Sequence, residues 1–207
     1  MKIEHWPEIA RIKSIAFGSD KPCKNIYVYL HGSGGFRTGY KGQYEYPDFA
    51  SLLQNGDIEL EQPFVVACCM DREHWFTGPL VKYLSELSAR FNGAKIDIIG
   101  YSRGGMGVYG LLQSGAALNS ATIINSRVSE SANLPKLPVH IIHATDDQHA
   151  SLEVIEAFVF KFGNEFTSLT AWPGDHFSIA SIAISGIWRR PVPQETTVAV
   201  NNFKRCI

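Results

Sequence analysis

Short, nearly continuous apolar runs alternate along most of this chain with segments whose apolar positions repeat at helical spacing. Such runs are typical of strands that are covered on both faces of a sheet. The predicted buried strands lie at residues 25–30, 63–70, 95–101, 121–125, 138–144 and 166–172. A partly alternating run at residues 9–17 predicts an additional early strand that runs antiparallel. The predicted helices lie at residues 47–54, 79–91, 103–113 and 151–162, with a final helix that ends near Trp188.

Strands that alternate with helices predict an α/β fold, in which a mostly parallel central sheet has helices on both faces. We expect one domain over residues 1–207, with residues 190–207 as a peripheral tail or as a small strand at one edge of the sheet. The connection at residues 126–138 is short, so no cap domain is expected there.

The overall charge and composition exclude several classes of partner. The formal net charge is -1, and 45% of the 207 residues are hydrophobic. This balance provides no basic surface for nucleic acid, and no apolar run is long enough to span a membrane. Because the first 20 residues carry charges where a signal peptide needs an apolar stretch, we expect a cytoplasmic protein. The sequence does not indicate an oligomeric state.

The strongest chemical motif is Gly100-Tyr101-Ser102-Arg103-Gly104, a G-x-S-x-G pattern between a predicted buried strand and a predicted helix. In this context the serine occupies a strained turn that presents its hydroxyl above the sheet edge. Side chains two residues before and after the serine would collide there, which explains Gly100 and Gly104. We therefore predict that Ser102 is a catalytic nucleophile.

The same segment contains a second glycine pattern, Gly105-Met106-Gly107-Val108-Tyr109-Gly110, which matches the dinucleotide fingerprint G-x-G-x-x-G. That fingerprint begins at the end of a strand and needs an acidic residue at the end of the next strand. Here the glycines begin inside the helix, and the next strand ends in Asn125-Ser126. We expect no nucleotide site and no cofactor.

A glycine-rich loop, His31-Gly32-Ser33-Gly34-Gly35, follows the strand at residues 25–30. Acyl transfer requires two N–H donors directed at the developing oxyanion. We predict that the backbone N–H groups of Ser33 and Arg103 form this oxyanion hole. His31 is expected to brace the loop.

A serine hydroxyl needs a base within hydrogen-bond reach, and the base needs an orienting acid. His176 follows the last predicted strand, and Asp147 follows the strand at residues 138–144. This gives the chain order Ser, Asp, His that the motif requires. Asp146 competes with Asp147, and we favour Asp147 from its position in the turn.

A metal site is not expected among the histidines of the strand at residues 138–144. His140 and His143 are three positions apart on this strand, so they point to opposite faces of the sheet. They cannot bind one metal ion together, and we interpret both as core or strand-end residues.

The chain resembles the α/β-hydrolase superfamily from about Asn25 to Trp188. The resemblance rests on the His31-Gly32-Ser33-Gly34 loop, the segment around Trp75, and the Ser102 motif with its following glycines. These look like the small esterase and predicted-peptidase branch, which includes feruloyl-esterase-like enzymes, with dienelactone hydrolases more distant. Arg103 and Ala144 depart from that branch, where an uncharged residue and a glycine are usual.

The resemblance implies a serine hydrolase that cleaves a small ester or thioester through an acyl-Ser102 intermediate. Gly34, Tyr40 and Trp75 are candidate substrate contacts, because the loops that carry them are placed to wall the pocket. An acyltransferase or cyclase with the same triad is a second interpretation. A catalytically silent binding protein on this fold is a third, although all three triad residues are present.

Overall fold

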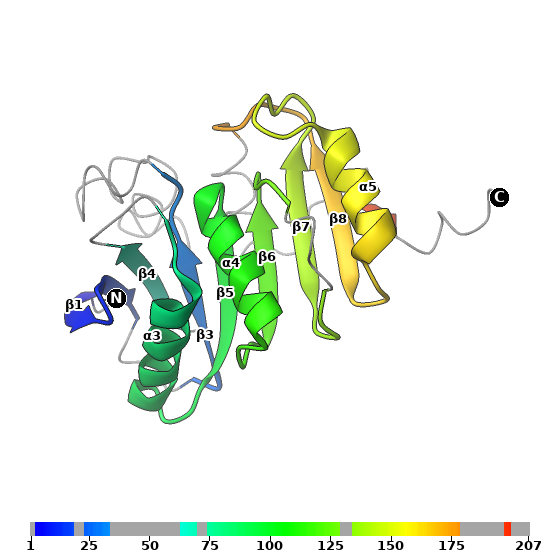
Figure 1. Ribbon diagram of the computed structural model, residues 1–207. Helices are drawn as coiled ribbons and strands as arrows, with labels where there is room; N and C mark the ends of the chain where they lie inside the picture. The colour runs from blue at the N-terminus through cyan, green and yellow to red at the C-terminus, as the bar shows by residue number, and fades with distance from the viewer. Residues whose placement is uncertain are drawn as a thin grey trace.

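The computed structural model of the protein describes residues 3–18, 23–33, 63–69, 74–128, 134–178 and 197–199. These residues form one twisted sheet with helices packed against it (Figure 1). The strands are β1 (Ile3–Ile9), β2 (Ile12–Phe17), β3 (Asn25–Leu30), β4 (Phe64–Cys69), β5 (Lys95–Tyr101), β6 (Ser120–Ile124), β7 (Val139–Ala144), β8 (Thr167–Trp172) and β9 (Thr197–Ala199). The helices are α3 (Thr77–Arg90), α4 (Arg103–Ser114) and α5 (Leu152–Phe162).

The nine strands of this sheet follow the spatial order β1-β2-β4-β3-β5-β6-β7-β8-β9 within the described residues. The central six strands are parallel to one another, whereas β1, β2 and β9 run antiparallel to their neighbours. The predicted mostly parallel sheet is therefore confirmed. Because parallel strands end at the same edge, the residues that follow β3, β5, β6, β7 and β8 meet there.

The first predicted strand differs in detail from the structure. Residues 9–17 do not form one strand, because the chain turns at Ala10 and Arg11, both of which have positive φ. β1 and β2 consequently form an antiparallel hairpin, and β2 also pairs antiparallel with β4, which confirms the predicted antiparallel direction. The tight turn contains no glycine that would mark it in the sequence.

Three helices cover one face of the sheet in Figure 1, with α4 in front of β5 and β6 and α5 in front of β7 and β8. They match the helices predicted at residues 79–91, 103–113 and 151–162. The helices predicted at residues 47–54 and up to Trp188 lie outside the described residues. In the tail, β9 confirms the small strand expected at one edge.

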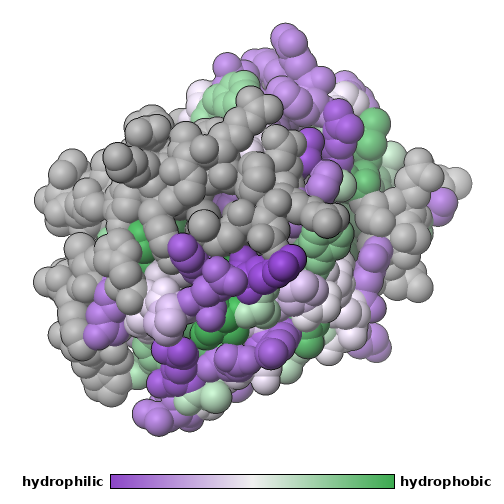
Figure 2. Space-filling view, turned by 60° about the vertical axis from the view of Figure 1, so that its left-hand side comes forward, coloured by the Kyte–Doolittle hydropathy of each residue, from purple (hydrophilic) through white to green (hydrophobic). Residues whose placement is uncertain are grey.

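The core is an apolar layer between the sheet and these helices. Its largest fully buried side chains include Leu30, Leu80, Tyr83 and Leu111. On the coloured part of the face that Figure 2 shows, hydrophilic side chains surround small separate hydrophobic areas. No helix among the described residues is long and apolar enough to cross a membrane.

A buried carboxylate joins three segments at the amino ends of the strands. Asp97 on β5 accepts hydrogen bonds from Asn25 Nδ2 at 2.9 Å, Asn119 Nδ2 at 2.7 Å and Ser120 Oγ at 2.5 Å. These donors come from the starts of β3 and β6. A buried carboxylate is tolerated when donors replace its lost hydration, so this cluster aligns the central strands.

We expect Asp97→Ala to lower the free energy of unfolding by about 3 kcal/mol, because three partly buried donors lose a buried, charged acceptor. Urea unfolding followed by circular dichroism measures this change. The control is Glu86→Ala, which removes an exposed pair with Lys82 at 4.0 Å. The control should change stability by less than about 0.5 kcal/mol. Equal losses in the two variants would contradict this account of Asp97.

Candidate active site

Ser102 occupies the sharp turn between β5 and α4. Its backbone has φ 53° and ψ -114°, a sparsely populated conformation for a residue with a side chain. The Ser102 N–H donates to the Ile124 carbonyl at 2.8 Å, which ties this turn to the end of β6. The side chain is therefore held at the carboxyl edge of the sheet, as the sequence motif predicted.

The turn is possible because two glycines allow close backbone approach. A Cβ atom at Gly100 would lie 2.5 Å from the carbonyl group of Gly104, and one at Gly104 would lie 2.0 Å from the Leu30 oxygen. Both distances are far below van der Waals contact, so neither position accepts a side chain without backbone movement. Gly105 and Gly107 approach side chains instead, those of Ser126 and Trp75.

Ser102, His176 and Asp147 form a continuous hydrogen-bonded chain. Ser102 Oγ lies 3.0 Å from His176 Nε2, and His176 Nδ1 lies 2.7 Å from Asp147 Oδ2. The His176 side chain is 8% exposed, and the Asp147 side chain is fully buried. A carboxylate only accepts, so Nδ1 carries the proton and Nε2 has a free lone pair toward the Ser102 hydroxyl.

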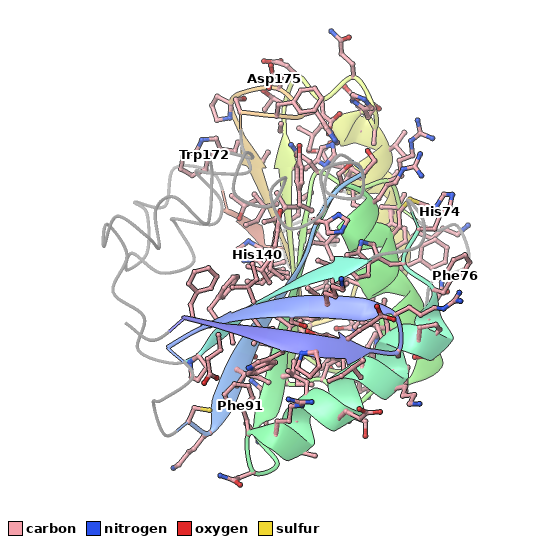
Figure 3. All side chains as sticks on the ribbon, turned by 90° about the vertical axis from the view of Figure 1, so that its left-hand side faces the viewer. His74, Phe76, Phe91, His140, Trp172 and Asp175 are labelled. Atoms are coloured by element: carbon pink, nitrogen blue, oxygen red, sulfur yellow. The ribbon has the colours of Figure 1, made fainter. Side chains whose placement is uncertain are left out.

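Asp147, and not Asp146, is the residue whose carboxylate faces His176. Asp146 is exposed, and its backbone N–H donates to the Gly174 carbonyl at 3.0 Å. That bond fixes the turn after β7 against the turn that carries His176. The adjacent Asp175 accepts hydrogen bonds from the backbone N–H groups of Phe177 and Ser178 and so caps its own turn. In Figure 3 it lies at the carboxyl edge of the sheet, at the other end of the molecule from Phe91.

The electrostatics of Asp147 favour its ionised form. Burial alone would raise its pKa, but hydrogen bonds from the His176 ring and from the His149 N–H outweigh it. The net effect holds the pKa of Asp147 below its ordinary value. The carboxylate is therefore charged over the whole neutral range.

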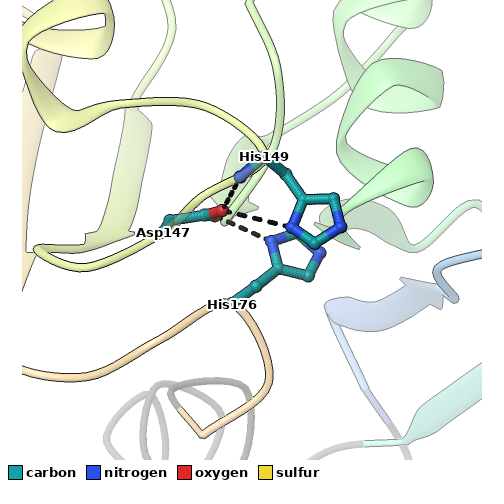
Figure 4. A group of neighbouring side chains, drawn as sticks. All are labelled: Asp147, His149 and His176. Atoms are coloured by element: carbon teal, nitrogen blue, oxygen red, sulfur yellow. Dashed lines mark hydrogen bonds and ion pairs between the residues drawn. The ribbon is translucent and has the colours of Figure 1, made fainter.

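Two further histidines lie beside Asp147, and the sequence did not single out their roles. His149 donates its backbone N–H to Asp147 Oδ1 at 2.7 Å, and its ring packs on that of His176 with 4.2 Å between centroids (Figure 4). His143 Nε2 lies 3.8 Å from Asp147 Oδ2 and donates to the Ala150 carbonyl at 2.8 Å. Burial lowers the pKa of His143, which keeps its ring neutral.

The loop that carries His176 is fastened from two neighbouring strands. The His176 carbonyl accepts a hydrogen bond from Tyr101 Oη at 2.8 Å and another from Asn125 Nδ2 at 2.9 Å. Asn125 Oδ1 also accepts the Ala144 N–H at 2.8 Å. Asn125 is a positioning residue that sequence reasoning missed. Its position directly after β6, at the carboxyl edge of the sheet where Ser102, Asp147 and His176 also lie, is the feature of the sequence that could have indicated this role.

The glycine-rich loop after β3 lies against Ser102. A Cβ atom at Gly32 would be 3.3 Å from Ser102 Cβ, and the buried His31 ring donates from Nδ1 to the Gly32 carbonyl. His31 thus braces the loop, as its position in the sequence indicated. Ser33 is the last described residue of this segment, and the expected contacts Gly34 and Tyr40 lie outside the described residues.

Trp75, predicted to contact substrate, has a role in bracing this loop. Its Nε1 donates to the His31 carbonyl at 3.0 Å, and its ring lies 4.8 Å from the His31 ring.

Arg103 begins α4, so its backbone N–H belongs to the first turn, where N–H groups have no acceptor within the helix. The Arg103 side chain points away to His74, with 3.4 Å between Nη1 and Nδ1.

Solved structures show the same fold at low sequence identity. An esterase of Pyrococcus furiosus superposes with a TM-score of 0.64 at 12% identity, covering 91% of this chain and 90% of that chain. A carboxylesterase from Mesorhizobium loti gives 0.63 at 16%, covering 89% and 99%. The esterase domain of a Rhodothermus marinus protein gives 0.60 at 14%, covering 92% and 98%. No protein-family model and no curated protein matches the sequence.

The chain therefore has the α/β-hydrolase fold, and its structural neighbours are esterases and hydrolases of similar size. The connection between β6 and β7, residues 125–138, is too short to hold a cap domain. The fold class expected from the strand and helix pattern is confirmed.

We expect Gly104→Ala to destabilise the protein by about 3 kcal/mol, because the new methyl group would collide with the backbone of β3. The matched control is Gly78→Ala on α3, where an added Cβ meets no atom within 4 Å. The control should be neutral or stabilising by up to about 1 kcal/mol, since alanine favours the helix. Thermal unfolding of both variants compares them, and similar melting temperatures would refute the close approach at Gly104.

The buried His31 should make stability depend on pH. Burial lowers its pKa from 6.5 to about 4, although the bond to Gly32 opposes this shift. Below pH 6.5 the unfolded chain binds a proton that the folded chain refuses until about pH 4. The contribution of His31 is thus complete above pH 6.5 and is lost, on the order of 3 kcal/mol, as the pH falls to about 4.

Urea unfolding of the wild type and of His31→Asn between pH 7.5 and 4.5 measures this dependence. As the pH falls through this interval, the free energy of unfolding should decrease less steeply in the variant than in the wild type, by about 1 kcal/mol per pH unit. The reason is that the unfolded variant has no imidazole at position 31 to bind a proton. The comparison uses the slope of the free energy of unfolding against pH, so a loss of stability that is the same at every pH does not affect it. Identical slopes would show that His31 titrates normally.

Proposed function

We propose that this protein is a serine hydrolase that cleaves a carboxylic ester or thioester through an acyl-Ser102 intermediate. The observation that carries the proposal is the chain of hydrogen bonds from Ser102 Oγ through His176 to Asp147, at 3.0 and 2.7 Å. A serine is inert at neutral pH without such a base, and the base needs an acceptor at its other nitrogen. Together these contacts supply both requirements.

In the acylation step, Ser102 Oγ attacks the substrate carbonyl carbon while His176 Nε2 accepts the hydroxyl proton. The resulting imidazolium is stabilised by the ionised Asp147 at Nδ1. His176 then returns the proton from Nε2 to the departing alcohol or thiol as the bond to the acyl group breaks. In the second half, water attacks the acyl-enzyme, again with His176 as base, and Ser102 leaves with its proton restored.

The negative charge that develops on the substrate oxygen needs preorganised donors. We assign these to the backbone N–H groups of Arg103 and Ser33. The first lies at the start of α4, and the second lies in the loop that packs against Ser102. Each such donor contributes a few kcal/mol to transition-state stabilisation. Because Gly32 has no side chain, this loop can lie close to Ser102.

The substrate class is proposed as a small ester or thioester. The esterases among the similar structures support this class, and the chemistry of the three residues requires no metal or cofactor. Whether water or another acceptor takes the acyl group separates hydrolysis from acyl transfer. Product analysis of a p-nitrophenyl ester reaction with added alcohol and amine measures how the acyl group is divided between water and these acceptors. If the acyl group went only to the alcohol or amine, the protein would be an acyltransferase and the proposed hydrolase activity would be wrong.

A fluorophosphonate probe should form one covalent adduct with the wild type, because an activated serine attacks its phosphorus atom and displaces fluoride. Intact-protein mass spectrometry detects the adduct. Ser102→Ala should show none. Ser114→Ala, which changes another serine on α4 that is bonded to the Leu111 carbonyl, should react fully. Absence of an adduct on folded wild-type protein would overturn the proposal in favour of a silent binding protein.

Asp147→Asn should lower kcat for ester hydrolysis by about 10⁴-fold, because an amide in place of the carboxylate favours the wrong tautomer of His176. Asp146→Asn is the matched control, since it makes the same change one residue earlier on an exposed side chain. The control should retain activity within about threefold. Steady-state kinetics on p-nitrophenyl acetate compares the two, and a larger loss in Asp146→Asn would reverse the assignment of the acid.

A further inference from the structure

A second imidazole lies at the carboxylate of the proposed triad. His149 Nδ1 lies 3.6 Å from Asp147 Oδ1, while His176 Nδ1 lies 2.7 Å from Oδ2 of the same carboxylate. The two rings are tilted by 33° from parallel, and both Nδ1 atoms face Asp147 (Figure 4). The proposed reaction uses the His176 ring and leaves the His149 ring without a chemical role.

We propose that Asp147, His149 and His176 form a binding site for one Zn²⁺ ion, and that zinc bound there reversibly inhibits the enzyme. Two imidazole nitrogens and one carboxylate oxygen are ligands that zinc prefers, and a fourth position remains for water. One ligand atom from each side chain lies within 4.8 Å of the other two. Ligand atoms around a tetrahedral zinc ion are about 3.4 Å apart, so small side-chain rotations suffice.

The exposure of the three side chains gives the ion a route to the site. His149 has 53% of its side chain exposed, whereas the Asp147 side chain is fully buried and that of His176 is 8% exposed. Zinc would therefore contact His149 first and then the carboxylate. The His149 segment is already anchored, because Arg127 Nε donates to the His149 carbonyl at 3.1 Å.

Neighbouring histidines do not compete for the ion. The buried His143 uses its Nε2–H for the Ala150 carbonyl at 2.8 Å. His140 contacts Thr170 Oγ1 at 2.9 Å on another part of the sheet. The site therefore has three protein ligands, and we expect it to bind one zinc ion per chain.

Inhibition follows from the proton balance of His176 and rests on the proposed function. Zinc takes the lone pair of Nδ1, so the proton that Nδ1 shared with Asp147 moves to Nε2 and the ring stays neutral. Nε2 then carries a hydrogen toward Ser102 Oγ, 3.0 Å away, and has no lone pair to accept the serine proton. Chelation of the ion restores the original tautomer.

The binding test is independent of turnover. Zinc chloride is titrated by calorimetry into Ser102→Ala, which keeps all three ligands and has no nucleophile. One ion per chain should bind. Adding His149→Ala should weaken the affinity by at least about tenfold. Adding His74→Ala, which removes an exposed histidine beside Arg103, should leave the affinity unchanged.

Co²⁺ added in place of zinc to the same variants tests the ligand set by visible absorption. A four-coordinate site with nitrogen ligands should give visible absorption bands in Ser102→Ala, and these bands should be lost when His149→Ala is added. No saturable binding to Ser102→Ala, or equal affinity with and without His149, would overturn the site.

The activity arm uses the wild type with p-nitrophenyl acetate. Zinc should inhibit it, and EDTA should restore the rate. In His149→Ala the inhibiting concentration, measured against that variant's own uninhibited rate, should rise by about tenfold or more. The fluorophosphonate adduct should also form more slowly with zinc.

The two proposals fail in distinguishable ways. Zinc that binds Ser102→Ala through His149, in a protein that neither hydrolyses esters nor reacts with the probe, would sink the hydrolase and leave the metal site standing. An active wild type that zinc neither binds nor inhibits would sink the metal site alone.

Discussion

The close approach of α4 to the ends of β3 and β5 is the constraint on which the proposed site depends. Ser102 has φ 53° and ψ -114°, a conformation that costs on the order of 1–3 kcal/mol and persists only where the surroundings hold it. Here the backbones of Gly100 and Gly104 are packed against their neighbours with no room for a Cβ atom. The same approach brings the first turn of α4 and the Gly32 loop to the serine. One packing contact thus sets the positions of the nucleophile and of both assigned oxyanion donors.

Around that contact, the site is assembled by hydrogen bonds between the ends of parallel strands. Asn125 after β6 holds the Ala144 N–H of β7 and the His176 carbonyl beyond β8, so one amide spans three strand ends. Tyr101 at the end of β5 reaches the same carbonyl. The backbone of the proposed base is therefore held by these two side chains, while its ring is held at Nδ1 by Asp147 and presents Nε2 to Ser102 for proton exchange. This arrangement agrees with a base whose ring must alternate between neutral and charged states.

The sequence predicted most of the fold and the three central residues of the site, for reasons that differ between them. Strands such as β3 and β5 are buried on both faces, so their apolar runs are unambiguous. Ser102 was found from its local glycines, and His176 and Asp147 from their order after strands. The Ala10–Arg11 turn was missed because it contains no glycine or asparagine. Asn125 and His149 were missed because their roles depend on contacts between strand ends, which spacing along the chain does not show.

The geometry that makes Asp147 a suitable acid also makes it a natural metal ligand. Its two oxygens are occupied from different directions, one by the His176 ring and the other by the His149 N–H, with the His149 ring 3.6 Å away. Catalysis needs the proton between Asp147 and His176 Nδ1, whereas a metal ion needs the lone pair at that nitrogen. The two states therefore exclude each other at a single atom. Because the His149 ring is exposed and lies on the solvent side of this pair, its presence would couple the proposed triad to the concentration of free metal ions without any change in the fold.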